Sequence, residues 1–488
     1  MNASAPEGQD LLIAGEWRPA AAGGRFERVD PYTGEVATLA AAGRREDARA
    51  AVAAARDAFP SWSETTPAER SAVLVEAARL LDERAAEVAA AMTAEVGATF
   101  GWGMFNCALA AGMLRAAGAQ AYATNGETIP SDVPGLTAMA VRAPAGVVVG
   151  MAPWNAPVIL SARAIATPLA FGNTVVLKGG EKCPRVHAAI VAAIADAGAP
   201  AGVVNFVLHA AEDAPEVVDE LCVNPAVRRV NFTGSTKVGR IIAVKCAENL
   251  KRCLLELGGK APFVVLADAD LEMATDAATF GAFMNSGQIC MSTERIVVDR
   301  AVADDLLGRL EARAAALVTG DPRDQGTMVG PVVDAPARDH ILELIADARD
   351  KGARILAGGD GAGNLLAPTI VADVTPEMRI YGEESFGPIV AAITVDGAEE
   401  AVRVANDSPY GLSAAVFGTD PDLAWSVAAR IESGICHVNG ATVHDEPQMP
   451  FGGVKDSGWG RFGGKAALEE FTELRWMTLQ RGPRHYPI

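Results

Sequence analysis

The chain has 488 residues, half of them apolar, and carries a formal net charge of −19. This length exceeds what one ordinary hydrophobic core accommodates, so two or three domains are expected. The acidic charge gives no electrostatic attraction to nucleic acid or to an anionic membrane surface, and neither is an expected partner. The composition is typical of a soluble α/β protein.

The N-terminal segment and the cysteines indicate where the protein acts. MNASAPEGQDLLIAGEW lacks a basic segment and does not resemble a signal peptide. The longest weakly charged region, residues 143–172, is interrupted by Arg163 and by several Pro and Gly, so it predicts a buried strand and helix and no membrane span. The seven cysteines form no CxxC pair, which indicates reduced thiols and a cytoplasmic location. The six histidines form no metal-binding pattern, and no metal site is expected.

The predicted elements alternate between helices and short strands. Amphipathic spacing predicts helices over residues 46–58 and 67–94, and residues 126–145 predict short strands outside the core. From residue 146 onward, β-branched runs alternate with helices, and a second such series runs from Pro262 to about residue 450. The tail, residues 465–480, predicts a helix followed by a strand. This alternation predicts a doubly wound, mainly parallel sheet.

The stretch MNSGQICMS, residues 284–292, contains a candidate nucleophile. Ser286-Gly287 lets the backbone turn, so the Cys290 thiol can face a cleft while its own amide points at an oxyanion. Free cysteine is also among the most buried residue types, so an inert structural thiol is the alternative from this stretch alone. No cysteine–histidine pair is evident, which disfavours protease chemistry.

A candidate base lies upstream, in LLELGGK. Glu256 follows an apolar run, and burial there would raise its pKa towards that of a useful base. A solvated surface carboxylate is the common alternative. Gly258-Gly259 would let a ligand or another backbone segment approach closely.

Three further segments carry polar groups that suit ligand binding. Asn155, in APWNAP, either donates its amide to an oxyanion or caps a turn. Gly234-Ser235 precede a predicted helix whose N-terminus suits a phosphate, although Ser235 can equally be an ordinary N-cap. The paired acids Glu383 and Glu384 either face solvent, or one of them binds sugar hydroxyls while Phe386 packs on a flat cofactor.

The order of these motifs is more specific than any one of them. APWN, LKGGE, FTGS, LELGGK, GQIC, EESFGP and PFGGVKDSGWGR occur in this order, and the chain resembles the aldehyde dehydrogenase superfamily over essentially its whole length. The resemblance implies a homodimer or homotetramer with three parts. These are a Rossmann-like NAD-binding domain (residues 1–125 and 146–256), an α/β catalytic domain (257–455) and an oligomerisation arm (126–145 and 466–488).

The same resemblance implies a mechanism. Cys290 attacks a small-molecule aldehyde to form a thiohemiacetal, whose oxyanion is held by the Asn155 side-chain amide and the Cys290 N–H. Hydride transfer to the nicotinamide leaves a thioester. Glu256 activates the water that releases the acid, and it also helps to deprotonate the thiol.

The resemblance further implies eight cofactor contacts. They are Lys178 and Glu181 at the adenosine ribose, Gly234 and Ser235 near the pyrophosphate, Glu384 at the nicotinamide ribose, Phe386 against the nicotinamide, and Trp154 and Leu257 as further contacts. Because Glu181 would repel a 2′-phosphate, NAD is favoured over NADP, whose use stays open.

Two positions depart from the common family pattern. The usual K-P-x-E becomes LKGGE here, which loses a stiffening proline after Lys178. The turn after GVVNFV, often glycine-rich, is LHAAED, so that His209 lies at that edge of the cofactor cleft.

Several stretches, such as PWNAPVILSARAIA and VNGATVHDEPQMPFGG, resemble the bacterial salicylaldehyde, benzaldehyde and vanillin dehydrogenases, the salicylaldehyde enzymes most closely. The predicted pocket residues are Trp102, Val158, Arg163, Ile289, Met291 and Phe451. Arg163 either contacts a phenolic or carboxylate group or forms a structural salt bridge. An apolar pocket discriminates poorly between ring substituents, so the exact aldehyde is left open.

Other functions stay open from the sequence. One is oxidation of an aliphatic aldehyde or a semialdehyde, and another is transfer of the acyl group to coenzyme A. Glu256 disfavours the acyl transfer, because hydrolysis of the thioester needs a base. A non-catalytic binding protein on this fold is disfavoured because Cys290, Glu256 and Asn155 are all present.

Overall fold

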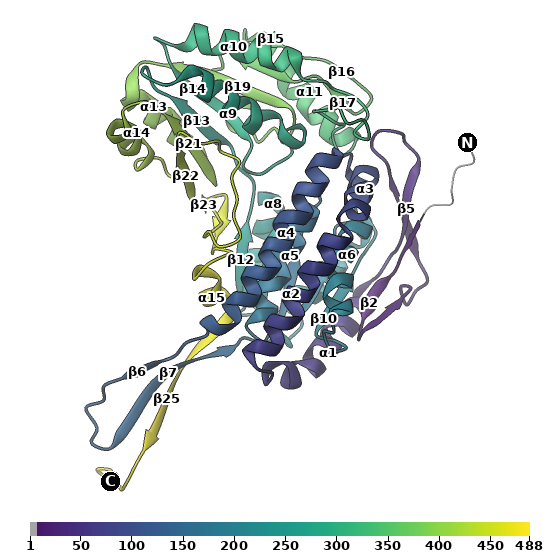
Figure 1. The fold of residues 1–488 in the computed structure, drawn as a ribbon, viewed down its shortest axis with the longest axis vertical. Coiled ribbons are helices and arrows are strands. Elements are labelled where there is room, and N and C mark those ends of the chain that lie inside the picture. Colours follow the sequence, from purple (N-terminus) through teal and green to yellow (C-terminus); the bar gives the residue numbers. More distant parts are fainter. Residues whose placement is uncertain (1–6) are drawn as a thin grey trace.

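The computed structural model describes residues 7–488. It has a lower body built on an eight-stranded sheet, an upper body built on a seven-stranded sheet, and a projecting three-stranded arm (Figure 1). The predicted mixed α/β fold class is confirmed.

The lower body contains an eight-stranded sheet in the order β24-β12-β11-β8-β9-β10-β2-β3. Its central strands, β12 to β10, are mutually parallel. The chain moves from β8 outward to β10 and then returns to β11 on the other side of β8, which creates a topological switch point. The strands are β24 (Gly458–Trp459), β12 (Arg252–Glu256), β11 (Val227–Thr233), β8 (Val147–Met151), β9 (Thr174–Lys178), β10 (Val204–Val207), β2 (Leu11–Ile13) and β3 (Glu16–Arg18).

Helices pack around this sheet, and an N-terminal three-stranded sheet, β1-β5-β4, lies beside it (Figure 1). The three strands are β1 (Glu7–Gln9), β5 (Val36–Ala41) and β4 (Arg25–Val29). The helices are α1 (Arg45–Ser63), α2 (Pro67–Glu83), α3 (Ala85–Val96), α4 (Phe100–Gln120), α5 (Pro157–Ala170), α6 (Pro184–Asp196), α7 (Ala214–Val223) and α8 (Thr236–Glu248).

The single helix predicted over residues 67–94 is wrong, because the structure divides this segment into α2 and α3 at Arg84. The start is as expected, since Thr66 accepts a hydrogen bond from the Glu69 amide and Pro67 occupies the first helical position. No Gly or Pro marks the break. Its cause is tertiary, since both helices pack on α4 and α6, but α3 also packs on β4 and β5 whereas α2 also packs on α5.

The upper body contains a seven-stranded sheet in the order β15-β18-β19-β14-β13-β21-β22, in which only β15 is antiparallel. The strands are β15 (Arg354–Ala357), β18 (Thr369–Ala372), β19 (Ile389–Val395), β14 (Thr293–Asp299), β13 (Ala261–Val265), β21 (Ser413–Phe417) and β22 (Ile435–Val438). The helices are α9 (Leu271–Phe283), α10 (Ala303–Ala316), α11 (Ala335–Asp350), α12 (Arg379–Gly382), α13 (Gly397–Asn406) and α14 (Pro421–Ala428).

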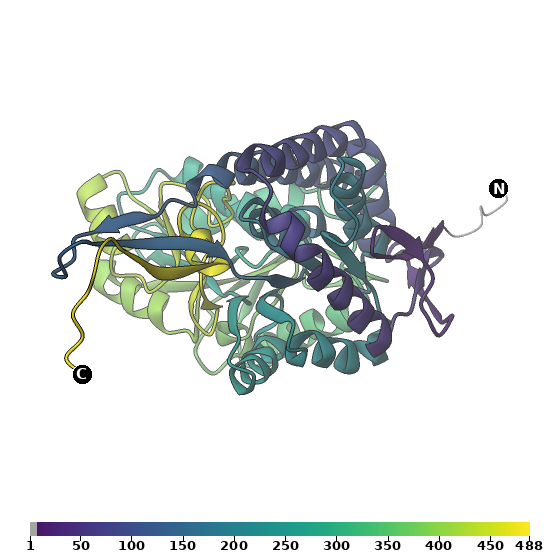
Figure 2. The same ribbon diagram turned by 90° about the horizontal axis from the view of Figure 1, so that it is seen from below.

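The arm projects from the lower body and carries the C-terminus near its tip (Figures 1 and 2). It joins β6 (Glu127–Ile129) and β7 (Leu136–Pro144) to β25 (Thr472–Gln480), which follows α15 (Ala466–Phe471). Both predicted features are confirmed, namely the outlying strands within 126–145 and the helix-then-strand tail. Segments more than 300 positions apart in the chain therefore form one ribbon.

Apolar side chains fill one core cluster in the lower body and two in the upper body. Across residues 7–488, every helix is too short or too polar to cross a membrane.

Candidate active site

Four predicted site residues lie at the carboxyl edge of the parallel strands in the lower body. Asn155 follows β8, Lys178 ends β9, Ser235 follows β11 and Glu256 ends β12. Parallel strands place their carboxyl ends at one edge, and ligands bind there beside a topological switch point. The fold therefore brings together residues that are up to about a hundred positions apart in the sequence.

Cys290 lies in a turn between the two bodies that we call the catalytic turn, residues 285–292. Asn285, Ser286 and Gly287 have φ values of 50°, 56° and 68°, which is left-handed backbone. A Cβ on Gly287 would lie 1.9 Å from the Gly387 carbonyl oxygen, so only glycine fits. Strained backbone of this kind persists only where surrounding contacts enforce it.

The glycine pair after Glu256 provides the close approach that the sequence predicts. A Cβ on Gly259 would lie 2.4 Å from the Cys290 carbonyl oxygen, and one on Gly258 would lie 2.6 Å from a Glu384 carboxylate oxygen. The absent side chains let the catalytic turn and the Glu384 carboxylate pack directly against this backbone.

Hydrogen bonds to its carbonyl hold Asn155 in place, whereas the two N–H groups that are predicted to bind the oxyanion have no acceptor in the described chain. The Asn155 carbonyl accepts hydrogen bonds from the Trp102 indole at 3.2 Å and from the Asn285 side-chain amide at 2.9 Å. Within residues 7–488, neither the Asn155 side-chain amide nor the Cys290 backbone N–H donates a hydrogen bond to the protein. Both donors are therefore available to an oxygen atom bound at this place.

Glu256 is fully buried, and neither of its carboxylate oxygens has a hydrogen-bond partner in the described chain. Burial raises the pKa of Glu256 to about 7, although the positive charge of Arg163 and the proximity of Cys290 oppose the shift. A carboxyl group with this pKa exchanges a proton readily near neutral pH.

The Cys290 thiol is held in its neutral form. Burial raises its pKa well above the usual value, and the neighbouring Glu256 carboxylate adds to the shift. The thiolate therefore forms when Cys290 loses its proton to a base, and Glu256 is the carboxylate whose charge and contact most affect the thiol.

Cys290 is one of the residues that line a cavity of about 890 Å³, whose wall is mainly apolar. Five of the six predicted pocket residues line it: Trp102, Arg163, Ile289, Met291 and Phe451. Several aromatic side chains that the sequence analysis did not single out complete the wall. They are Phe100, Phe105, Phe280 and Phe283.

The predicted pocket role of Val158 is wrong. Its side chain is fully buried and absent from the cavity wall, which Ile159 and Leu160 line instead. These residues are on α5, where successive side chains point about 100° apart, so a neighbour in sequence faces the core.

Arg163 forms a salt bridge with Asp445, and both side chains are buried. Its guanidinium also lies over the Phe451 ring, 3.9 Å from the centroid. The sequence left open whether Arg163 contacts the substrate or forms a structural salt bridge, and the structure shows the salt bridge. The second Asp445 oxygen has no hydrogen-bond partner among residues 7–488.

The predicted ribose-binding residues form a short turn after β9, which we call the ribose turn, residues 178–181. Burial lowers the pKa of Lys178. Burial pushes the pKa of Glu181 upward, but the charge of Lys178, a backbone hydrogen bond and the nearby charge of Lys182 together outweigh this effect, and the net pKa is lowered. The turn therefore presents an ionised carboxylate beside a lysine.

Glu384 and Phe386 form another side of the site, where Phe386 packs against Trp154. Glu384 accepts a hydrogen bond from the Gly259 amide at 2.7 Å. The Trp154 and Phe386 rings pack edge to face with centroids 5.7 Å apart.

Glu294 and Lys260 hold this side of the site in place, and the sequence analysis did not find them. Glu294 accepts hydrogen bonds from the Phe386 and Ser385 amides, and it forms a buried 2.6 Å ion pair with Lys260. Lys260 in LELGGK was the sequence signal for this ion pair, but its partner Glu294 could be recognised only from the fold.

These residues fit a nicotinamide dinucleotide. Ser235 caps the 13-residue helix α8 by accepting a hydrogen bond from the Val238 amide, so the first turn of that helix can receive a phosphate. A Cβ on Gly234 would lie 2.4 Å from the Phe232 ring, so this approach to the helix requires glycine. Leu257 is buried beside α8, where its side chain contacts Gly239.

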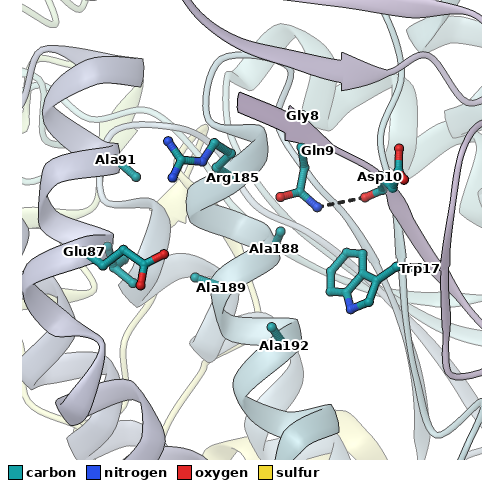
Figure 3. A pocket seen from close by; sticks show the side chains of 11 residues that line it. Gly8, Gln9, Asp10, Trp17, Glu87, Ala91, Arg185, Ala188, Ala189 and Ala192 are labelled. Carbon is teal, nitrogen blue, oxygen red and sulfur yellow. Dashed lines mark hydrogen bonds between the residues drawn. The ribbon is translucent and has the colours of Figure 1, made fainter. Parts of the chain in front are cut away.

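A second cavity, of about 420 Å³, lies away from these residues, between the N-terminal strands and helices α3 and α6 (Figure 3). Gln9, Asp10, Trp17, Glu87 and Arg185 are among its lining residues. It contains none of the predicted catalytic or cofactor residues. No cluster of three metal-ligating side chains occurs in the part of the chain that the structure describes.

Comparison with known proteins identifies the family. The aldehyde dehydrogenase family matches residues 17–477. The chain belongs to this family. It is accordingly an enzyme, an aldehyde dehydrogenase that uses a nicotinamide cofactor.

Individual relatives are similar over their full lengths. A vanillin dehydrogenase from Pseudomonas fluorescens is 56% identical over 98% of this chain and 99% of its own. A salicylaldehyde dehydrogenase from Pseudomonas putida is 44% identical over the same shares. The crystal structure of a salicylaldehyde dehydrogenase from Pseudomonas putida G7, complexed with salicylaldehyde, superposes with a TM-score of 0.97, covering 99% of this chain and 100% of that one at 44% identity.

These identities confirm the resemblance to the aromatic branch of the aldehyde dehydrogenases but correct its order. We expected the salicylaldehyde dehydrogenases to be the more similar group. Over the whole chain, however, the vanillin dehydrogenase is 56% identical and the salicylaldehyde dehydrogenase 44%.

Proposed function

We propose that this aldehyde dehydrogenase oxidises an aromatic aldehyde to the carboxylic acid with NAD. The observation that carries the proposal is the cavity of about 890 Å³ that Cys290 lines together with Trp102, Phe105, Phe280, Phe451 and other apolar side chains. Flat aromatic walls favour a flat ring. Relatives named for vanillin, salicylaldehyde and benzaldehyde support the same substrate class.

In the first step, Cys290 transfers its proton to Glu256, and the thiolate sulfur attacks the aldehyde carbon. The oxygen of the resulting thiohemiacetal carries negative charge. The Asn155 amide and the Cys290 N–H, which have no other acceptor in the described chain, donate hydrogen bonds to it. Donors already in place cost no reorganisation when the charge develops.

A bound NAD would supply the acceptor for the hydride that leaves the thiohemiacetal carbon. Lys178 and Glu181 would hold its adenosine ribose, Ser235 its pyrophosphate, and Glu384 its nicotinamide ribose. The ionised Glu181 accepts hydrogen bonds from ribose hydroxyls and repels a 2′-phosphate, which supports NAD over NADP.

The remaining thioester is hydrolysed with the help of Glu256. Glu256 first releases to solvent the proton that it took from Cys290, which its pKa of about 7 allows. The carboxylate then takes a proton from water, hydroxide adds to the thioester carbon, and the Cys290 sulfur leaves as a thiolate that regains a proton from Glu256. The product is the free acid. A base at this position favours hydrolysis over transfer to coenzyme A.

The substrate ring contacts apolar walls, since the Arg163 charge is already neutralised by Asp445. We therefore expect uncharged aromatic aldehydes to be better substrates than aldehydes with a carboxylate. This distinguishes the proposal from oxidation of an acidic semialdehyde.

The deciding experiment is a panel of kcat/KM values for benzaldehyde, salicylaldehyde, vanillin, hexanal and succinic semialdehyde, each with NAD and with NADP. The proposal expects the aromatic compounds with NAD to be highest, and free acid as product with or without coenzyme A. A preference for hexanal or succinic semialdehyde would contradict the substrate class, and a preference for NADP would contradict the cofactor.

We also propose that the enzyme is a cytoplasmic homodimer or homotetramer, consistent with the absence of disulfides among its seven cysteines. Val238, Ile241 and Val244 form an exposed apolar stripe on α8, and Leu474 and Trp476 are exposed on β25 of the arm. Monomers rarely leave apolar surface of this extent uncovered. Light scattering tests this assembly, and a monomer at micromolar concentration would contradict it.

A further inference from the structure

Two buried histidines lie against the ribose turn, outside the catalytic cavity. His187 is in α6 and His209 follows β10, and their exposed fractions are 0% and 1%. A buried imidazole needs partners for both ring nitrogens, and those partners decide which nitrogen carries the proton.

His209 holds the Lys178 ammonium. Its Nδ1 lies 2.8 Å from the Ala210 carbonyl oxygen, which can only accept, so Nδ1 carries the proton. The bare Nε2 then accepts a hydrogen bond from Lys178 Nζ at 3.0 Å. Lys178 retains two further N–H groups for a ligand.

His187 holds the backbone of the same turn. The Gly180 amide donates to His187 Nδ1 at 2.9 Å, and His187 Nε2 donates to the Pro153 carbonyl at 3.1 Å. The ring therefore joins the ribose turn to the segment that carries Trp154 and Asn155.

The ribose turn has Gly179 where the common K-P-x-E pattern has a proline, and hydrogen bonds hold this turn instead. The Gly179 amide donates to the Val207 carbonyl at 2.9 Å, and a proline there has no N–H to donate. A Cβ on Gly179 would also lie 2.6 Å from the Phe206 ring, so no larger residue fits. Hydrogen bonds to neighbouring segments therefore restrict this turn, whereas a proline ring restricts it in the common K-P-x-E pattern.

Both histidines are neutral at neutral pH. Burial lowers the pKa of His187 to about 3 and that of His209 to about 4, and the Lys178 charge contributes in both cases. Glu181 opposes each shift but does not reverse it. Neutral rings agree with the tautomers that the hydrogen bonds require.

We propose that His187 and His209 are positioning residues for the adenosine-ribose site, which hold the ribose turn in its binding geometry before the cofactor arrives. The inference rests on the proposed placement of the ribose at Lys178 and Glu181. Preorganisation of this kind increases affinity by removing the ordering cost of binding. The histidines should therefore affect cofactor affinity and leave the chemistry at Cys290 unchanged.

The test is equilibrium binding of ADP-ribose and of NAD to the purified full-length enzyme without aldehyde, followed by tryptophan fluorescence. His209→Leu and His187→Leu remove the hydrogen bonds, whereas His209→Gln and His187→Gln keep one donor and one acceptor. The Leu variants should bind both ligands about tenfold more weakly, as expected for the loss of a hydrogen bond in a site with a charged group, and the Gln variants should recover most of the affinity.

Two controls separate positioning from general damage. Nicotinamide mononucleotide lacks the adenosine ribose, and its affinity should not change in any of the four variants. The kcat at saturating NAD and the KM for aldehyde should also stay at wild-type values. If a Leu variant fails to fold, the Asn variant at the same position replaces it, because the shorter side chain keeps polarity but reaches less far towards Lys178 or Gly180.

Lys178→Met and Glu181→Gln distinguish the two possible failures. If both bind ADP-ribose like the wild type, the proposed cofactor placement is wrong. If both weaken binding while folded His209→Leu and His187→Leu do not, the placement stands and the positioning role is overturned. In a Lys178→Met background, adding His209→Leu should cost no further affinity, because its partner is already gone.

Discussion

Polar groups around the catalytic turn lack hydrogen-bond partners in the described chain, whereas those of the ribose turn named below have them. Around Cys290, the backbone is left-handed at three successive residues, and the Asn155 amide, the Cys290 N–H and both Glu256 oxygens have no partner in the described chain. In the ribose turn, the Gly179 and Gly180 amides and the Lys178 ammonium are all hydrogen-bonded.

The difference follows from what each turn must do. Groups that stabilise a transient charge must be free until the charge appears, which leaves unsatisfied polar atoms and strain in the resting enzyme. Groups that bind a stable ligand work best when they are already fixed. Substitutions in the first turn should therefore change rate, and substitutions around the second should change affinity.

The largest effect should come from Cys290→Ala. Without the nucleophile no thiohemiacetal forms, and kcat should fall by roughly 10⁴-fold or more. NAD affinity should stay close to the wild-type value, because the ribose turn is untouched. Steady-state NADH formation and a fluorescence titration measure the two quantities, and retained NADH formation would overturn the mechanism.

Glu256→Gln should lower kcat by about 10²- to 10⁴-fold, the usual contribution of a general base. Because the Glu256 pKa is raised to about 7, its carboxylate form is populated above that pH, so wild-type activity should rise as the pH increases through about 7. The Glu256→Gln variant should lack this limb of the pH profile, the rise in activity through about pH 7. A pH profile of kcat from 5.5 to 9 measures it, and an unchanged limb would assign the titration to another group.

Asn155→Ala removes one oxyanion donor and should lower kcat by about 10²- to 10³-fold. The KM for NAD should not change. Asn285→Ala is the comparison, because it keeps the Asn155 side-chain amide and removes the hydrogen bonds from the Asn285 side-chain amide to the Asn155 and Gln288 carbonyls, and it should have a smaller effect. Equal losses in the two variants would indicate that Asn155 acts through its backbone.

A pair of glycine substitutions compares the stability of the two turns. In Gly287→Ala, the new Cβ would meet the Gly387 carbonyl oxygen at a backbone φ of 68°, and unfolding free energy should fall by at least about 3 kcal/mol. In Gly180→Ala, the nearest atom is Cys183 Sγ at 3.3 Å, and the change should stay within about 1 kcal/mol. Thermal unfolding measures both, and similar losses would contradict the assignment of strain to the catalytic turn.

Local sequence patterns were enough to predict much of the fold and to single out many of the candidate site residues. Strand-and-turn patterns located the segments that carry Asn155, Lys178, Ser235 and Glu256, because short β-branched runs ending in Gly or Pro are local signals. The order of the motifs around Cys290 indicated the family. The roles assigned to these residues remain predictions for the experiments above.

Contacts between side chains that are distant in the sequence could be recognised only once the fold was known. The break between α2 and α3, the orientation of Val158 away from the cavity, and the salt bridge that occupies Arg163 each depend on contacts with distant segments. The same holds for Glu294 with Lys260 and for His209 with Lys178, partners 34 and 31 positions apart. Local periodicity predicts which face of an element is apolar, but it does not predict what that face will pack against.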